Sequence, residues 1–339
     1  MKYLKLFETN TEFQEFINSD EFIRPNVTYV KEVKGLSFEP SLPIEKELPY
    51  LTMTALEDDL TVSLSTNPCQ YSLNGTEWNE LQAGEQTPSI NTGEKIYFKG
   101  SIEQGSSVGT FTVSKRFNLS GNVMSMIFCD EAEGKTDLTG YNGCFDRTFQ
   151  NCTGLEKVSK NFLPATTLAD GCYALMFGGC ASLINTPELP ATTLAEGCYA
   201  GMFASCTSLI QVSELPATTL AASCYNSMFQ DCTSLETAPE LPATTLADDC
   251  YDMMFMVCTS LINAPELPAT SLTNYCYGMM FMGCTSLNHI KMLATDISAQ
   301  SCLSDWVYGV SETGTFVKSA DATWDESEVI PEGWTVETV

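Results

Sequence analysis

Apolar and polar positions recur along the middle of the chain with a period of 26 residues. The string Leu-Pro-Ala-Thr-Thr-Leu-Ala begins at Leu163, Leu189, Leu215 and Leu241, and a variant of it begins at Leu267. After each copy comes Cys-Tyr-x-x-Met-Phe-x-x-Cys, in which apolar pairs alternate with variable pairs. A fixed period of about 20 to 50 residues predicts a solenoid, in which similar units stack and share one core.

The pattern inside one unit predicts a short helix. Cys250, Met254 and Cys258 stand at positions i, i+4 and i+8, as on the apolar stripe of a helix. The segment that follows ends in Pro-Glu-Leu-Pro, and two prolines so close together exclude a helix and favour an extended segment. We therefore expect a short helix, a turn, a short strand and a turn back in each repeat.

The region before the repeats alternates apolar and polar residues, which is typical of strands. Asn74-Gly75 lies between two such runs and is a strong hairpin signal. The predicted strand segments read LTMTALEDDLTVSLS, QYSLNGTEWNEL, KIYFKGSI, GTFTVSKRFNLSG and NVMSMIF. A β-sandwich-like domain is the expected result.

The fold class predicted for the whole chain is α+β, in four parts. These are a small docking module at 1–46, with a helical pattern from Thr11 to Asn18, and the β-sandwich-like domain at 47–128. The solenoid follows at 129–302, and a cap at 303–339 should cover its open end. The solenoid begins with an irregular copy at Cys144 and Cys152. A last copy begins at Cys302 but has Val310 where a second cysteine would stand.

The chain has 15 cysteines, and 13 of them fall on the repeat pattern. The two cysteines of one copy are eight residues apart, which on a helix is about 12 Å and too far for a disulfide. A buried thiol is a small apolar core residue, so we expect ladders of reduced thiols. Disulfides between neighbouring repeats are the alternative, and zinc is disfavoured because CxxC and Cys/His clusters are lacking.

The formal net charge of −27 limits the classes of partner. No Lys or Arg occurs between Lys160 and Lys291. Such an acidic surface repels the phosphates of nucleic acids and anionic lipid headgroups, so neither is an expected partner. No run is apolar enough for a membrane span or a secretory signal, which favours a protein made in a cytoplasm.

The repeats resemble the leucine-rich repeats of the BspA-like family. The signature Phe-x-x-Cys-x-Ser-Leu of that family is present from Phe203 to Leu209, from Phe229 to Leu235 and from Phe255 to Leu261. The whole chain also resembles virion proteins of bacteriophages that infect gut Bacteroidales. That second resemblance rests on the opening MKYLKLFET and on the order of module, β domain and repeats.

These resemblances imply a non-enzymatic virion component, a fibre or decoration protein. The module at 1–46 would then contact other virion proteins, and the repeats would contact a host surface protein or glycan. A homo-oligomer is compatible with this arrangement. Two alternatives stay open: a BspA-like adhesin on a bacterial cell surface, and a carbohydrate-binding accessory protein using Trp78, Trp306 or Trp324.

Catalytic chemistry is not indicated, and no cofactor is expected. The single histidine, His289, lacks a nucleophile partner, and no phosphate loop, G-x-S-x-G or H-E-x-x-H motif occurs. Four glutamates recur once per repeat, at Glu188, Glu214, Glu240 and Glu266. Stacking would place them about 5 Å apart, either as a solvated acidic edge or, less favoured, as weak candidates for a Ca²⁺ ladder.

A methionine cluster is the second candidate surface. The positions between the apolar pairs are small or polar in the second and third repeats, as at Gly201 and Ser227, but several of them are methionine or valine in the fourth and fifth. An outward apolar patch often marks a contact site, and methionine suits adaptable contacts. The alternative is that the C-terminal tail or the β domain covers these side chains. The predicted partner-binding residues are Met253, Met256, Val257, Met279 and Met282.

Overall fold

The fold of this chain is described by a computed structural model, which defines residues 48–339. The predicted docking module at 1–46 lies outside the described residues. Residues 48–339 form one compact unit that is rich in β-structure, and its helices are short. The helices are α2 (Ser125–Phe128), η2 (Cys129–Glu131), η3 (Lys160–Phe162) and η4 (Glu326–Glu328).

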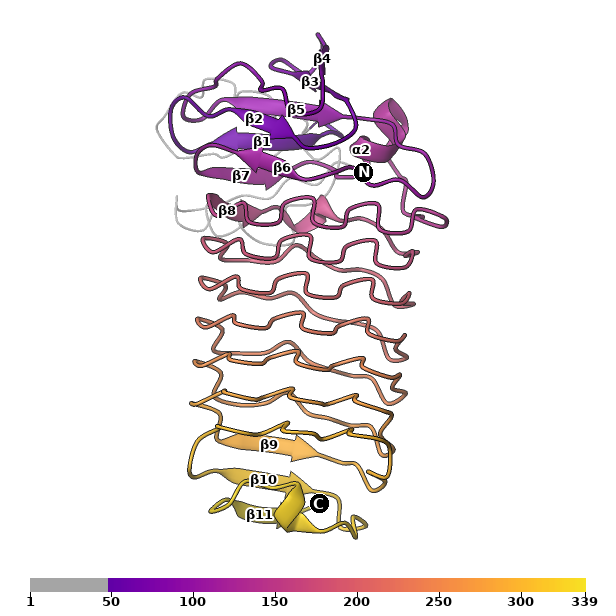
Figure 1. Ribbon diagram of the computed structural model, residues 1–339, viewed down its shortest axis with the longest axis vertical. Helices are drawn as coiled ribbons and strands as arrows, with labels where there is room; N and C mark the ends of the chain where they lie inside the picture. The colour runs from indigo at the N-terminus through magenta and orange to yellow at the C-terminus, as the bar shows by residue number, and fades with distance from the viewer. Residues whose placement is uncertain (1–47) are drawn as a thin grey trace, which may run out of the picture. The chain divides into compact units, whose positions relative to one another are not determined.

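The β domain is built on a 6-stranded sheet with the order β4-β3-β5-β1-β7-β8 (Figure 1). Its strands are β1 (Leu51–Ala55), β3 (Cys69–Ser72), β4 (Asn79–Leu81), β5 (Lys95–Lys99), β7 (Phe117–Ser120) and β8 (Leu155–Val158). The predicted hairpin is confirmed, since β3 pairs antiparallel with β4 across Asn74-Gly75. Gly75 has a φ of 74°, a conformation that costs glycine little.

A second, 2-stranded sheet pairs β2 (Val62–Leu64) with β6 (Phe111–Val113). Phe98 of β5 and Phe111 of β6 connect the two sheets, with ring centroids 5.2 Å apart. The strand predicted for NVMSMIF is wrong, because this segment contains the helix α2. Its Ser125 hydroxyl donates to the Phe98 carbonyl and accepts from the Leu51 N–H, which ties the helix to the sheet.

The core of the β domain continues into the repeats. Strand β7 pairs in parallel with β8, which belongs to the first irregular repeat. The Phe111 N–H donates to the carbonyl of Thr148, and the rings of Phe111 and Phe149 stack 5.3 Å apart. The predicted domain boundary at residue 128 is therefore crossed by backbone hydrogen bonds and by a shared core, and as a boundary it stays a prediction.

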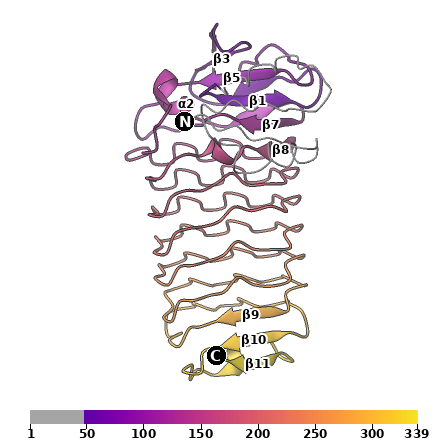
Figure 2. The same ribbon diagram turned by 180° about the vertical axis from the view of Figure 1, so that it is seen from behind.

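Successive repeats lie side by side as a stack of turns of the chain (Figures 1 and 2). Parallel β-bridges join the second threonine of each Leu-Pro-Ala-Thr-Thr string to its counterpart, from Thr167 to Thr193, Thr219 and Thr245. On the opposite run, bridges join Thr237 to Asn263 and Asn263 to His289. Equivalent residues of neighbouring repeats are therefore in register on both runs.

The helix predicted for Cys-Tyr-x-x-Met-Phe-x-x-Cys is wrong. We number the five regular repeats from the one that begins at Leu163, so that the second begins at Leu189. In the second repeat, the N–H groups of Tyr199 and Phe203 donate to the carbonyls of Cys224 and Met228 in the next repeat. Those of Cys198 and Met202 instead donate three residues back along the chain. The segment is therefore a series of four-residue turns, in which every second N–H bonds to the neighbouring repeat. A helix would instead direct its N–H groups to carbonyls four residues back within the same segment.

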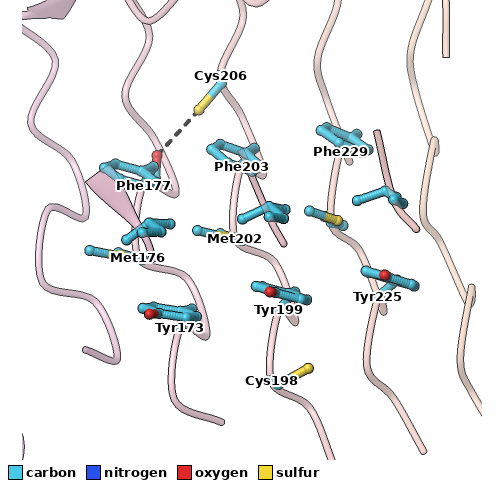
Figure 3. Close-up of a cluster of buried hydrophobic side chains, with 14 of the residues drawn as sticks. Tyr173, Met176, Phe177, Cys198, Tyr199, Met202, Phe203, Cys206, Tyr225 and Phe229 are labelled. Atoms are coloured by element: carbon cyan, nitrogen blue, oxygen red, sulfur yellow. Dashed lines mark hydrogen bonds between the residues drawn. The ribbon is translucent and has the colours of Figure 1, made fainter. Parts of the chain in front are cut away.

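The inward residues of these turns form ladders through the core (Figure 3). Rings at the tyrosine position stack from Tyr173 to Tyr199 and from Tyr199 to Tyr225, with centroids 5.9 and 5.8 Å apart. A parallel ladder of phenylalanines includes Phe177 and Phe203, 5.6 Å apart. The methionine between each pair is fully buried as well. These identical side chains explain why the repeats keep one spacing.

The C-terminal segment extends the stack by further strands. Strand β10 (Thr315–Lys318) pairs in parallel with β9 (His289–Met292) and with β11 (Thr335–Thr338). Trp306 ends the aromatic ladder, is 1% exposed, and donates its indole N–H to the Val329 carbonyl at 2.9 Å. The C-terminal segment thus buries Trp306 and adds strands in register with β9.

Candidate binding surface

The outward side of the four-residue turns is the part of the repeats that varies. Pairs of buried residues, Cys-Tyr and Met-Phe, alternate with pairs of outward residues, and we call the outward pairs of all repeats the turn face. In the repeat that begins at Leu189, the turn face consists of Glu196, Gly197, Ala200, Gly201, Ala204 and Ser205. The Leu-Pro-Ala-Thr segment and the buried pairs are identical in the five copies. Divergence on the turn face is therefore not a consequence of a loosely specified core.

The second residue of each outward pair has a left-handed backbone. In the second repeat these residues are Gly197, Gly201 and Ser205, with φ of 56°, 60° and 60°. Glycine suits such positions, whereas a bulky or β-branched residue there is unusual. Yet the late repeats place Met253, Val257 and Met279 at equivalent positions, with φ of 56°, 62° and 48°. Left-handed geometry costs a non-glycine residue about 1 kcal/mol or more.

The structure places the five predicted partner-binding residues together on the turn face of two adjacent repeats. All five are half-buried. The Met253 N–H donates to the carbonyl of Gly278, the residue before Met279, at 2.8 Å. The Val257 N–H donates to the carbonyl of Met282 at 2.7 Å. The sequence alone did not point to Tyr308, which occupies the position of Met256 and Met282 in the last copy and is 71% exposed.

Some side chains on the turn face pack against a glycine of the next repeat, where a larger residue would clash with them. A Cβ on Gly201 would come within 2.6 Å of the Leu175 side chain, and one on Gly179 within 2.3 Å of Asn151. Each of these glycines stands 26 or 28 residues after the residue that it accommodates. Large and small residues in neighbouring repeats are therefore coupled, a relation that the repeat pattern alone does not reveal.

Asp252 is the least exposed carboxylate on this face. Its side chain is 8% exposed, and its Oδ2 accepts a hydrogen bond from Asn226 Nδ2 at 3.2 Å. Burial, together with the nearby charge of Asp249, raises the pKa of Asp252 to about 6. Loss of solvation disfavours the charged form, and a like charge adds to that effect. Asp252 therefore binds a proton at a higher pH than an exposed aspartate does.

The cysteine ladders are predicted by the sequence and present in the structure. All 15 cysteines are free thiols, and all except Cys129 are buried. The second cysteine of each repeat donates to the phenylalanine carbonyl of the preceding repeat, as from Cys206 to Phe177 at 3.2 Å (Figure 3). Burial raises the pKa of Cys206 to about 12. These thiols therefore serve as core residues and hydrogen-bond donors, not as nucleophiles.

The other candidates from the sequence occupy separate places. Glu188, Glu214, Glu240 and Glu266 are exposed, and Glu266 pairs with Lys291 at 3.0 Å. Among residues 48–339, no cluster of histidine, cysteine or acidic side chains has an arrangement that could hold a metal ion. The calcium ladder therefore gains no support from the side-chain arrangement. His289 is half-buried on β9, in register with Thr315.

The three tryptophans of the carbohydrate-binding alternative are already engaged. Lys99 Nζ lies 4.2 Å from the ring centroid of Trp78, and the same ammonium pairs with Asp130 at 2.8 Å. Trp306 is buried, and Trp324 donates to the Ala294 carbonyl at 2.9 Å while Lys318 lies over its ring. Their rings are thus used in packing, which leaves the turn face as the stronger candidate surface.

Comparisons with models of known protein families, with curated proteins and with solved structures gave no match to this chain. Within the described part, no helix has the length and apolar character needed to cross a membrane.

Proposed function

We propose that this chain is a non-enzymatic structural protein of a bacteriophage virion, a fibre or decoration component. Its repeats would form a solenoid of the leucine-rich-repeat type, with a 26-residue unit, and would present the turn face to a host or mucosal surface. Residues 1–46 would attach the chain to other virion proteins. Synthesis in the cytoplasm of the infected host is part of this proposal.

One observation carries the proposal of a display protein. The buried Cys-Tyr and Met-Phe pairs are identical in the five repeats, whereas the outward pairs on the turn face differ from copy to copy. An enzyme would need a constellation of reactive groups in one place. Here the buried thiols and tyrosines have raised pKa values because they are buried, and this makes them poor nucleophiles and bases. Extended repeat stacks of this kind are suited to binding partners along their surface.

The virion assignment rests on the resemblance to proteins of phages that infect Bacteroidales. The alternative with the best support is a BspA-like adhesin on a bacterial cell surface, because the repeats would suit either context. Both alternatives share the display of the turn face and differ in the particle that carries it.

Immunoelectron microscopy distinguishes the two alternatives. Antibodies against the full chain should label purified phage particles grown on Bacteroidales hosts and should leave uninfected cells unlabelled. Labelling of uninfected cells, with none on particles, would replace the virion assignment by the adhesin. Separately, fluorescently labelled full chain should bind host cells or mucin. Absence of binding to both would contradict attachment as its role.

A further inference from the structure

The late repeats carry an apolar patch that the fold does not require. We define the late-repeat patch as Met253, Met256, Val257, Met279, Met282 and Tyr308. At the positions of Met253 and Val257, the second repeat has Gly201 and Ser205 and forms the same hydrogen bonds to its neighbour. Smaller residues therefore satisfy the backbone at these positions.

Local backbone preference opposes the residues that are present. Val257 is β-branched and has a φ of 62°, and both Met253 and Met279 are left-handed as well. Glycine would remove the backbone strain at each of these positions. The chain has glycine at Gly283 and Gly309, which stand one and two repeats after Val257. Apolar side chains that oppose local preference on an outward face point to a contact with a partner.

The surroundings of the patch define the charge of that partner. Asp248 and Asp249 precede Met253 on the same turn face, and Asp231 belongs to the neighbouring repeat. The stretch 161–290 contains 11 acidic residues and no Lys or Arg. A second copy of the chain would bring the same negative charge, and an anionic membrane would be repelled. A cationic partner is attracted, and its on-rate rises at low salt.

We propose that the late-repeat patch binds a protein segment that presents apolar side chains next to lysine or arginine residues. The apolar side chains pack on the methionines, whose flexible thioethers adapt to different shapes. The cations lie over Asp248 and Asp249. This inference rests on the proposed display function and specifies the chemistry of the partner that the late repeats select.

The test uses the full chain and three short peptides as probes. The first is an amphipathic peptide of leucine and lysine, and in the other two either lysine is replaced by glutamate or leucine by serine. Calorimetry should detect binding of the leucine–lysine peptide, weakened by added salt. Each of the other peptides lacks either the cations or the apolar side chains, and should bind at least about tenfold more weakly, a loss of about 1.4 kcal/mol.

Matched variants locate the binding site. Met279→Ser with Met282→Gln gives the fifth repeat the residues that the third repeat has at these positions, Ser227 and Gln230. Ser227 adopts a φ of 54° there, so the backbone accepts the exchange. The control, Ser227→Gly with Gln230→Ala, gives the third repeat the residues of the second. The first variant should weaken peptide binding about tenfold or more and the control less than about twofold, because two partly buried methionines are lost only in the first.

Several outcomes would overturn the inference. Equal binding of the serine–lysine peptide would show attraction by charge alone, and equal binding of the leucine–glutamate peptide would show apolar contact alone. Failure of the leucine–lysine peptide to bind would do the same. So would dimers in sedimentation that Met279→Ser/Met282→Gln abolishes, or binding to anionic phosphatidylglycerol vesicles that this variant removes. If host-cell binding persists in the variant, the proposed function stands and only this surface is excluded.

Discussion

The carboxylate of Asp252 occupies the space that a side chain at residue 278 would fill. A Cβ on Gly278 would lie 2.6 Å from Asp252 Oδ1, closer than such atoms approach. Gly278 has an ordinary backbone conformation, so it is the neighbouring carboxylate that excludes a side chain there. This pair shows how one repeat determines the residue that is tolerated in the next.

Gly278→Ala should therefore destabilise the protein by about 1 to 3 kcal/mol, the usual cost of overpacking. Chemical denaturation of the purified variant measures this directly. Gly178→Ala is the matched control: it also lies on the turn face with an ordinary φ, and its nearest contact would be 3.4 Å, to Leu175. That change should have an effect within about 0.5 kcal/mol. Combining Gly278→Ala with Asp252→Ala should recover most of the loss, and an equal effect of both glycine substitutions would contradict the account.

Asp252 should also make stability depend on pH. Its pKa is about 6 in the folded protein against an ordinary value of 3.8. The folded state therefore binds this proton more tightly, and the associated stability is fully present below pH 4 and lost as pH rises through about 6. Asp252→Asn should remove this slope and should be more stable than the parent at pH 8, by about 1 to 2 kcal/mol.

Urea denaturation at pH 5 and pH 8 of parent and variant isolates the effect. Other carboxylates, such as Asp58 and Asp296, have lowered pKa values because they accept hydrogen bonds from Thr92 and Ser298. Their contribution is lost only in stronger acid, and it cancels in the difference between the two proteins. Glu240→Gln removes an equal charge from an exposed position and should leave the difference between the two pH values unchanged. The same slope in Asp252→Asn as in the parent would refute the assignment.

Much of the β-structure could be predicted from the sequence, and the repeat helix could not. Alternation predicted β1 and β5, and Asn74-Gly75 predicted the hairpin of β3 and β4. Cys250, Met254 and Cys258 share one side in a helix, but they also do so in four-residue turns. The choice is made by hydrogen bonds to the adjacent repeat, such as Tyr251 N–H to the Cys276 carbonyl, which no single repeat encodes.

For the candidate site, the sequence supplied the residues but not their relations. The outward direction of the methionines was predicted from the face opposite the apolar stripe of a helix, whereas the structure has four-residue turns in this segment. The contact of Asp252 with Gly278 and the left-handed backbone of Val257 depend on how neighbouring repeats lie against each other. The signal that could have found the first of these contacts is a glycine that stands one repeat after a larger residue, as Gly278 stands 26 residues after Asp252.

The aromatic end of the stack should be a point of high stability. Trp306 packs on Phe281 and Phe316, with centroids 6.2 and 6.1 Å away. Trp306→Ala should cost about 3 to 5 kcal/mol, because it opens a cavity and leaves the Val329 carbonyl without its donor. Since repeats stabilise their neighbours, hydrogen exchange should accelerate most in the last repeats and least near Cys172. Uniform acceleration of exchange along the chain would contradict this local role. Trp306→Phe keeps an aromatic ring in the core and should lose much less stability than Trp306→Ala.

The thiols give the most direct test of the core. Cys129 is half-exposed, whereas the other cysteines are buried. In the native protein, a thiol reagent at pH 8 should therefore modify Cys129 rapidly and the rest only as the chain unfolds. Burial raises the pKa of Cys180 well above its usual value and that of Cys224 to about 12, so little thiolate is present at these sites.

In denaturant the same reagent should count 15 free thiols, and Cys129→Ser should remove only the fast phase. Cys232→Ala, by contrast, should destabilise the fold by about 1 to 2 kcal/mol, because it deletes a buried sulfur and its contact with the Phe203 carbonyl at 3.2 Å. A count well below 15 without reductant would mean that neighbouring ladder cysteines are bridged. Rapid modification of several thiols in the native state would mean that the stack opens locally, and the repeats would then be too mobile to hold the turn face as one surface.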